Sequence, residues 1–294
     1  MNLGPCLTKN CLSNITWCKV TKLKQDSHHS KGNQMSFYDN RYAVLSRALN
    51  KLSNVAMLFY DSRLIDIAIE KSDRERVSFA LDVGTGQGTD AILFSKRCDC
   101  VVAVDISLNA LITAKALARS ANVKNKVFFI QADAEHLPFR EDVFDLVYCK
   151  DVLHHVCDSV QSIREMKRVA REEARIVAVE ANGLNPQMVA IGLIYFSIDK
   201  GVFRNTSSKL SNIFWKADLK DVQVTETEFF PRHVFFEYRS PLNRFLMSHK
   251  DSMLRFLSRM ENGWQRLVFL PRFSNYLIVS AYKITDARGT PINK

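Results

Sequence analysis

The segment LDVGTGQGTD, Leu81–Asp90, places three glycines, a threonine and two acids within one short stretch. Glycine gives a loop unusual backbone angles and lets a ligand approach the main chain closely. The glycines follow the pattern G-T-G-Q-G, at Gly84, Gly86 and Gly88, so the dinucleotide-binding pattern G-x-G-x-x-G fails by one residue. No G-K-[ST] follows, which excludes a phosphate-binding P-loop. We therefore expect the loop to bind a different ligand.

Acidic residues end three of the apolar runs in this part of the chain. Asp82 lies at the mouth of the first run, Asp105 ends VVAVD about 20 residues after the glycines, and Asp133 ends KVFFIQAD. A carboxylate at the tip of a second strand is placed to bind both hydroxyls of a ribose. An acidic rim would repel a pyrophosphate, and it favours a ligand with a ribose, an amino group and a positively charged sulfur. The alternative is that these acids are ordinary strand-end and cap residues.

Strands and helices are expected to alternate around these residues. Five runs are apolar and β-prone: VSFALDV, VVAVD, KVFFIQAD, FDLVYC and ARIVAVEA. Helical patterns lie between them, including TDAILFSKRC, DSVQSIREMKRVAR and SLNALITAKALARSAN, which opens with Ser107 as a capping residue. This alternation predicts a parallel sheet with right-handed crossovers and helices on both faces. Two helices are expected over Phe37–Glu70, and DVQVTETEFF and SNYLIVSAYK are expected to be the last two strands.

Five segments, taken in order, resemble the motifs of class I S-adenosylmethionine-dependent methyltransferases: LDVGTGQG, AVDIS, QADAEHLPF, FDLVYCKDVLHHV and RIVAVEANGLNP. The resemblance runs from about Ser78 to Asn185, and it is greatest to the small-molecule branch, similar to ubiquinone/menaquinone-type and generic LHH methyltransferases. It implies an α/β fold with a Rossmann-like seven-stranded sheet, the last strand antiparallel, N-terminal helices and a helical lid. It also implies S-adenosyl-L-methionine as cofactor and methyl transfer to a small, apolar or lipid-like acceptor.

The resemblance assigns cofactor-binding roles to residues of this sequence. At the first strand and the loop it implies Asp82, Gly84, Thr85, Gly86 and Gly88, the last four lining the methionine half. Asp105 would hold the ribose, with Ile106 against the adenine. Asp133, beside Ala134, would meet the adenine amino group. Lys150 would contact the cofactor through its backbone.

The chemistry of methyl transfer directs attention to KDVLHH, which follows the fourth expected strand. Positioning of the two reactants is worth roughly 7–11 kcal/mol, and a base is needed only if the acceptor must lose a proton. His155 and His154 are the candidate bases, because histidine titrates near neutral pH. The alternatives are that His155 caps or packs the next helix, or that both histidines and Asp151 bind a divalent metal. We expect no metal.

Motifs that are absent from the sequence narrow the class of methyl acceptor. No N-P-P-[YF] run follows the fourth strand, which argues against methylation of amino groups on DNA bases. Cys149 and Cys157 are expected to be ordinary buried thiols and not the pair that RNA cytosine C5 methylation needs. The seven cysteines form no disulfide-like pattern, no signal-peptide core opens the chain, and no run of about 18 apolar residues occurs. We expect a cytoplasmic protein with reduced thiols.

The formal net charge of +10 is compatible with nucleic acid, an anionic membrane or an acidic substrate. Residues Ser240–Met260 predict a lid helix with one apolar face, made of Leu242, Phe245, Leu246, Met253, Phe256, Leu257 and Met260. Four basic residues lie mostly elsewhere on it: Arg244, Lys250, Arg255 and Arg259. The lid could pack on the core with a solvated basic face, cover a lipid-like substrate at an anionic membrane, or bind RNA.

The chain is expected to divide into five parts: a flexible extension (1–35), N-terminal helices (36–76), the S-adenosylmethionine-binding core (77–185), lid helices with the last two strands of the same domain (186–283), and a tail (284–294). The expected partner is a small-molecule acceptor, with peripheral contact to an anionic membrane. Two other functions stay open. One is an RNA or protein methyltransferase, and the other is a non-catalytic, cofactor-binding assembly factor.

Overall fold

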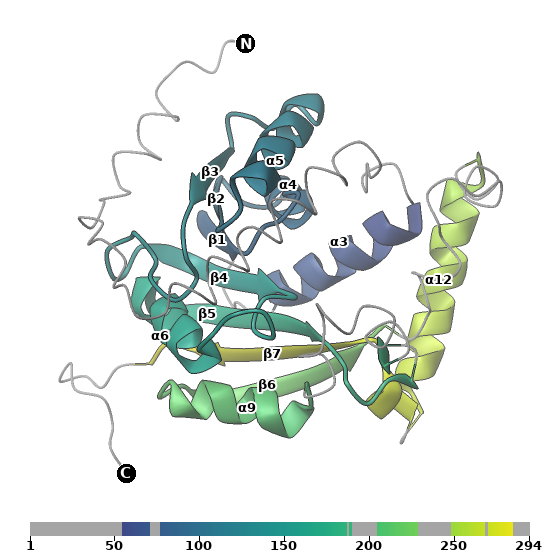
Figure 1. The fold of residues 1–294 in the computed structure, drawn as a ribbon. Coiled ribbons are helices and arrows are strands. Elements are labelled where there is room, and N and C mark those ends of the chain that lie inside the picture. The colour runs from purple at the N-terminus through teal and green to yellow at the C-terminus, as the bar shows by residue number, and fades with distance from the viewer. Residues whose placement is uncertain are drawn as a thin grey trace.

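The computed structural model describes residues 55–70, 77–186, 188–189, 205–228, 248–267 and 270–284. They contain one seven-stranded sheet of order β3-β2-β1-β4-β5-β7-β6 (Figure 1). The strands are β1 (Phe79–Val83), β2 (Cys100–Asp105), β3 (Val127–Gln131), β4 (Phe144–Lys150), β5 (Ala170–Ala181), β6 (Lys220–Thr227) and β7 (Tyr276–Tyr282). The first five strands are parallel, and β7 runs antiparallel to both of its neighbours. The expected seven-stranded sheet with an antiparallel last strand is confirmed.

Helices cover both faces of the sheet. On one face lie α3 (Val55–Glu70), α4 (Thr89–Phe94) and α5 (Leu108–Ser120), and on the other lie α6 (Ser159–Val169) and α9 (Ser207–Lys216). Successive strand residues point to opposite faces, so the central strands contribute to two apolar clusters. In β4, Val147 and Cys149 pack with α6 and α9, whereas Leu146 and Tyr148 pack on the α3–α4 side. Burial of both faces is the reason that these strands are apolar without alternation.

The capping residue expected before α5 is confirmed. The hydroxyl of Ser107, which is fully buried, accepts a hydrogen bond from the backbone N–H of Ala110 at 3.1 Å. In the N-terminal region, α3 accounts for one of the two helices expected over Phe37–Glu70, and residues 37–54 lie outside the described part. Helix α6 passes directly into β5, which begins at Ala170.

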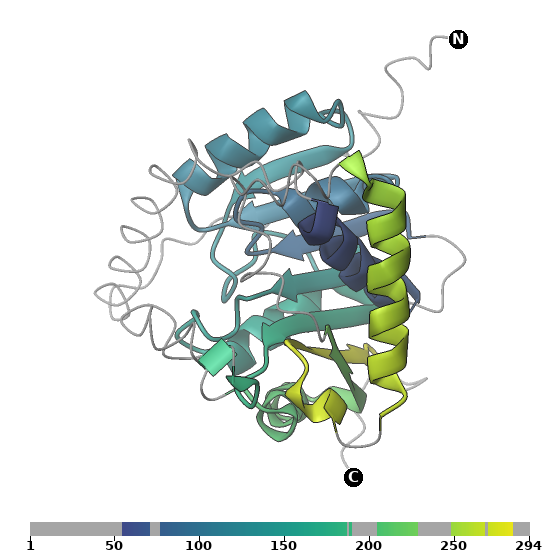
Figure 2. The same cartoon turned by 90° about the vertical axis from the view of Figure 1, so that its right-hand side faces the viewer.

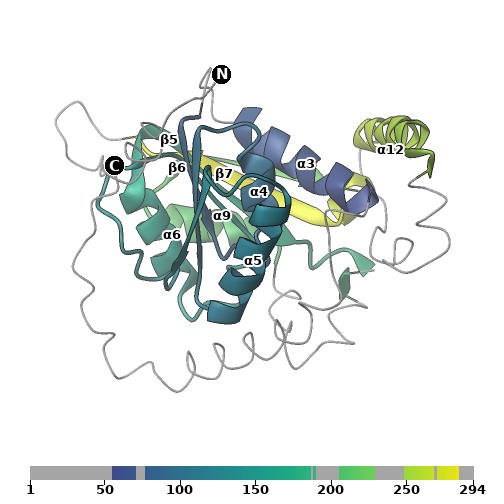
Figure 3. The same ribbon diagram turned by 90° about the horizontal axis from the view of Figure 1, so that it is seen from above.

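The expected lid helix differs from the observed one in its bounds. Helix α12 spans Lys250–Gln265, so it ends beyond Met260. Residues 240–247 of the predicted helix, with Leu242, Arg244, Phe245 and Leu246, lie outside the described residues. Figure 2 shows α12 crossing in front of α3, and in Figure 3 it lies outside α3 at the edge of the molecule.

The apolar face expected on α12 is only partly covered by α3. Leu257 is fully buried and packs with Tyr60 of α3, and Met253 is partly buried beside them. Phe256 and Met260, however, are 50% and 36% exposed. Successive helical residues are about 100° apart, so Phe256 points well away from Leu257 and does not reach α3.

Two further expectations meet the structure only in part. The four described cysteines are free thiols, with Cys98, Cys100 and Cys149 buried, but Cys157 is exposed and not buried as expected. Within the described ranges, no helix combines the length and the apolar character that crossing a bilayer requires. The division of the chain into five parts stays a prediction, and residues 1–54 and 285–294 lie outside the described residues.

The Ser107 cap yields a test of the fold. Ser107→Ala should lower the free energy of unfolding by about 1 kcal/mol, because the N–H of Ala110 then loses its acceptor. Ser120→Ala at the other end of α5 is the control, since that hydroxyl is exposed and the change should stay within about 0.5 kcal/mol. Urea denaturation measures both, and equal effects of the two changes would contradict the capping role.

Candidate functional site

The candidate site lies where the strand order reverses. From β1 the chain proceeds outward through β2 to β3, and from β4 it proceeds outward in the opposite direction through β5. In open α/β sheets, ligands bind outside the carboxyl ends of the strands at such a point. The glycine loop leaves β1 there, Asp105 ends β2, and Lys150 ends β4. The fold thus brings together residues that the sequence places far apart.

The glycine loop is held by its own packing. All three glycines have positive φ angles, 72° at Gly84, 53° at Gly86 and 76° at Gly88. A Cβ atom at Gly84 would overlap the side chain of Val152, and one at Gly88 would lie 2.7 Å from Cβ of Ala114 in α5. Gly84 and Gly88 are therefore required by neighbouring protein atoms, whether or not a ligand also contacts them.

Asp105 fastens the loop to the start of α5. One carboxylate oxygen accepts a hydrogen bond from the N–H of Gly86 at 2.8 Å, and the other accepts one from the N–H of Ser107 at 2.9 Å. Each carboxylate oxygen has two lone pairs, and Asp105 is only partly buried. The next residue, Ile106, is also partly buried, and its carbonyl accepts a bond from the side chain of Gln131.

A buried group of carboxylates surrounds the ammonium of Lys150. Lys150 Nζ lies 2.9 Å from Asp61 of α3 and 3.0 Å from Asp90 of α4. Tyr148 donates its hydroxyl proton to the same Asp90, at 3.2 Å. Asp82, at the end of β1, accepts a hydrogen bond from the Thr85 hydroxyl at 2.6 Å. We call Asp61, Asp82, Asp90 and Lys150 the acid cluster.

Negative charge is in excess within the acid cluster. The pKa of Asp82 is raised to about 7, by burial first and then by the neighbouring Asp90 carboxylate, against the Thr85 hydrogen bond and the Lys150 charge. The pKa of Tyr148 is also raised, by burial first and then by Asp90. An added positive charge would therefore be stabilised here. The sequence-based expectation for Lys150 involved its backbone, whereas the structure places its side chain in this cluster.

Two polar side chains of the loop are buried without a partner. Gln87 Oε1 and Thr89 Oγ1 have no hydrogen-bond partner among the described residues. Buried polar atoms are nearly always bonded, so such atoms beside a candidate site indicate groups that a ligand can satisfy.

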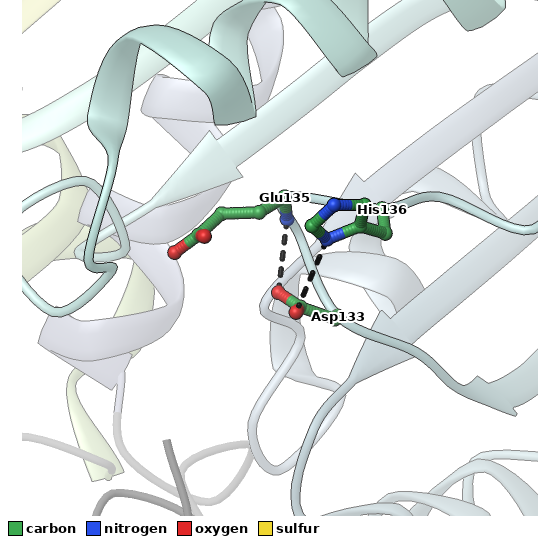
Figure 4. A group of neighbouring side chains, drawn as sticks. All are labelled: Asp133, Glu135 and His136. Carbon is green, nitrogen blue, oxygen red and sulfur yellow. Dashed lines mark hydrogen bonds and ion pairs between the residues drawn. The ribbon is translucent and has the colours of Figure 1, made fainter. Parts of the chain in front are cut away.

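Asp133 and Ala134 follow β3, one strand farther from the reversal point. The Asp133 carboxylate accepts a bond from the N–H of Glu135 at 3.0 Å and lies 3.6 Å from Nδ1 of His136 (Figure 4). Ala134 between them is partly buried and packs against the core. Although Asp133, Glu135 and His136 have atoms at metal-binding separations, the Glu135 carboxylate accepts the N–H groups of Cys157 and Asp158 before α6. That structural use explains the group without a metal.

The two candidate bases differ in their surroundings. Nδ1 of His154 lies 2.5 Å from a carboxylate oxygen of Glu180, and only 4% of the His154 side chain is exposed. His155 is partly buried, and its ring centroid lies 3.8 Å from that of His154. A histidine fixed to a carboxylate is suited to positioning, and the adjacent ring of His155 is only partly buried.

Glu180 organises the segment after β4. One carboxylate oxygen accepts the N–H groups of Val152 and Leu153, at 3.0 and 2.7 Å. The other meets His154 and accepts a bond from the side-chain amide of Asn205 at 3.0 Å. Glu180 is fully buried, and these bonds distribute its charge over four groups.

Sequence reasoning assigned no role to Asp61, Asp90 or Glu180. One signal was present for Glu180, because a carboxylate within the apolar run IVAVEA must find partners when the strand is buried. Asp90 lies two residues after Gly88 in the first turn of α4, at a position where an acid suits a helix start. Nothing in the sequence around Asp61 connects it to Lys150.

The chain is similar to known methyltransferases over its central part. Residues 81–178 match a family described as a methyltransferase domain. The chain is 30% identical over 123 residues to the uncharacterized methyltransferase YcgJ of Bacillus subtilis, covering 42% of this chain and 48% of YcgJ. It is 32% identical over 159 residues to the demethylmenaquinone methyltransferase of Thermus thermophilus, covering 53% of this chain and 66% of that protein. The matched segments thus span about half to 66% of these relatives.

Solved structures share the fold. The crystal structure of YcgJ has a TM-score of 0.51 at 19% identity, covering 76% of this chain and 98% of that one. A chain in the complex of the Haloferax volcanii Trm112 methyltransferase activator with its methyltransferase has a TM-score of 0.55 at 15% identity, covering 83% and 98%. At these identities the likeness concerns the fold alone.

The acid cluster predicts how stability depends on pH. Asp82 holds its proton up to about pH 7 when folded, whereas its ordinary value is 3.8. Between these values the folded state binds the extra proton, so stability falls as the pH rises. The Asn side chain of Asp82→Asn has no proton to lose, so the free energy of unfolding of this variant should not fall in the same way. The difference in unfolding free energy, variant minus wild type, should increase by roughly 2–3 kcal/mol from pH 5 to pH 8, at about 1.4 kcal/mol per pKa unit.

Urea unfolding of both proteins at the two pH values measures this difference. Glu141→Gln, an exposed position, is the control for losing one negative charge. A difference between Asp82→Asn and the wild type that does not change with pH would contradict the assigned pKa.

Proposed function

Residues 81–178 form a methyltransferase domain of the class I S-adenosylmethionine-dependent type, and we propose on this premise that the protein transfers a methyl group from S-adenosylmethionine to a small, apolar acceptor. The observation that carries the proposal is the acid cluster beside the glycine loop. A site with a surplus of buried carboxylates favours a cationic ligand and disfavours a pyrophosphate. S-adenosylmethionine carries both an ammonium and a sulfonium group.

The residues present fit this cofactor. The carboxylate of Asp105 at the end of β2 suits the two ribose hydroxyls, with Ile106 against the adenine. Asp133 and Ala134, which follow the neighbouring strand β3, would meet the adenine amino group. The loop residues Gly84, Thr85, Gly86 and Gly88 would line the methionine half, where the unpartnered atoms of Gln87 and Thr89 lie. Asp82 would face its positive charge across the same loop.

The chain's own contribution to the reaction is binding, orientation and proton removal. The bound cofactor supplies an electrophilic methyl group. The acid cluster and Asp105 would hold the two ends of this cofactor and so orient it towards the acceptor. His155 takes a proton from the acceptor where one must leave, and His154, fixed by Glu180, supports the ring of His155.

The names of the relatives support the proposed class of acceptor, a small organic molecule. The Thermus protein is named for demethylmenaquinone, and a relative from Amycolatopsis mediterranei, 31% identical over 142 residues, is named for 27-O-demethylrifamycin SV. Both names describe small organic acceptors. We also place the protein in the cytoplasm, because its described cysteines are free thiols, as a reducing compartment favours.

The central experiment is incubation with radiolabelled S-adenosylmethionine and fractionated cell extract. Label in the lipid or small-metabolite fraction supports the proposal. Label in RNA or protein would move the acceptor to that class. Cofactor binding with no label in any fraction would point to a non-catalytic role.

Asp105→Ala should weaken S-adenosylmethionine binding by roughly 1.5–3 kcal/mol, because hydrogen bonds to a charged group have that worth. Since Asp105 also orders the loop, a cofactor analogue without the ribose 2′-hydroxyl separates the two roles. The analogue should bind the wild type more weakly than the cofactor, and the variant should not distinguish the two. Isothermal calorimetry measures all four affinities, and a variant that still prefers the complete ribose would refute the ribose assignment.

His155→Asn should lower kcat by about 10²–10⁴ for an acceptor that loses a proton, which is the usual contribution of a general base. The Kd for S-adenosylmethionine should not change. His136→Asn is the control, as that histidine is exposed and follows β3. Steady-state kinetics with the acceptor found by labelling decide the matter, and an unaltered kcat in His155→Asn would remove His155 from the reaction.

A further inference from the structure

The outer side of α12 and the short 3-10 helix η4 (Leu270–Phe273) combines exposed apolar and basic side chains. We call it the α12–η4 surface. Its apolar members are Phe256, Met260, Leu267 and Phe273, which are 50%, 36%, 45% and 47% exposed. Its basic members are also exposed: Arg255, Arg259, Arg266 and Arg272. Four of the large exposed apolar side chains of the described residues thus gather on one short stretch.

The side chains of α12 form two separate rows. With Leu257 buried against α3, a step of about 100° per residue puts Arg255, Arg259 and Arg266 roughly opposite it. Phe256, Met260 and Leu267 then fall about 80° to one side of Leu257. The first turn also exposes Asp251, while Glu261 is buried on the α3 side. The exposed face is therefore apolar along one edge and positively charged along the next.

The apolar row beside the arginine row indicates the chemistry of the partner that this surface would bind. Arginines alone would suit a nucleic acid or plain solvent. Solvent gains nothing from a row of Phe, Met and Leu, and a nucleic acid would stack its bases on Phe but gains little from Met and Leu. An anionic membrane satisfies both rows, because the apolar side chains enter the headgroup boundary while the arginines meet the anionic lipids. The net charge of +10 acts in the same direction.

We propose that the α12–η4 surface docks the protein on an anionic membrane surface. Leu257 of α12 packs on Tyr60 of α3, and the next residue of α3, Asp61, belongs to the acid cluster. Docking would thus place the candidate site one helix away from the lipid. The docking itself does not depend on methyl transfer. Its use in meeting an apolar acceptor rests on the proposed function.

Vesicle sedimentation with the full chain tests the docking. The wild type should bind phosphatidylcholine vesicles that contain phosphatidylserine far better than vesicles of phosphatidylcholine alone. Changing Arg255, Arg259 and Arg266 together to Gln should weaken this binding about 100-fold, because each basic residue near the surface contributes roughly fivefold. Changing Phe256 and Met260 together to Ser should also weaken it, since their apolar insertion is lost.

The matched control changes Lys96, Arg140 and Lys216 together to Gln, which removes the same charge from exposed positions outside α12 and η4. Binding by this control close to that of the wild type supports the proposal. The proposal fails if the wild type does not bind anionic vesicles, or if the control loses as much vesicle binding as the α12 triple variant. It also fails if that triple variant loses RNA retention and keeps vesicle binding. Calorimetry with S-adenosylmethionine on the same proteins separates membrane docking from the proposed function. A variant that has lost docking should still bind the cofactor. If the proposed function is wrong, the wild type itself should not bind the cofactor.

Discussion

The charges enclosed where β1 and β4 end hold the surrounding elements together. The Lys150 ammonium links Asp61 on α3 to Asp90 at the start of α4, so two helices are tied to one strand end. Asp82 extends the group into the glycine loop through Thr85. Removing these charges from water is costly unless each is paired. The position of α3, the first turn of α4 and the course of the loop therefore depend on one another, and a cationic ligand would complete the balance.

Carboxylates fix the other loops of the site in a related manner. Asp105 accepts backbone N–H groups from the glycine loop and from the start of α5, and Glu180 accepts those of two residues after β4. Glu135 does the same before α6. Hydrogen bonds to a charged acceptor are stronger than neutral ones, so a few acids stiffen segments that have little secondary structure of their own. His155, the proposed base, is carried by one of these segments.

The sequence predicts the sheet well because its signals are local. Glycines after an apolar run, Ser107 before a helical pattern and acids at strand ends each act over a few residues. The partners of Lys150 and His154 could not be predicted, since Asp61 lies 89 residues from Lys150 and Glu180 lies 26 from His154. For α12, periodicity correctly indicates a helix with apolar residues, but which of them are covered depends on where α3 lies. Leu257 and Phe256 are adjacent in sequence, and only the contact with Tyr60 distinguishes them.

Because Lys150 pairs with two carboxylates, positions 61 and 150 of the acid cluster do not tolerate substitution equally. If Asp61 is lost, the ammonium keeps Asp90, and one counter-charge fewer relieves part of the negative excess. If Lys150 is lost, two carboxylates remain enclosed with like charges as neighbours, at a cost of several kcal/mol. In lineages that descend from this protein, substitution at position 61 could therefore come first and alone. A substitution of Lys150 would have to follow the loss of an acid, so the two substitutions can accumulate in one order only.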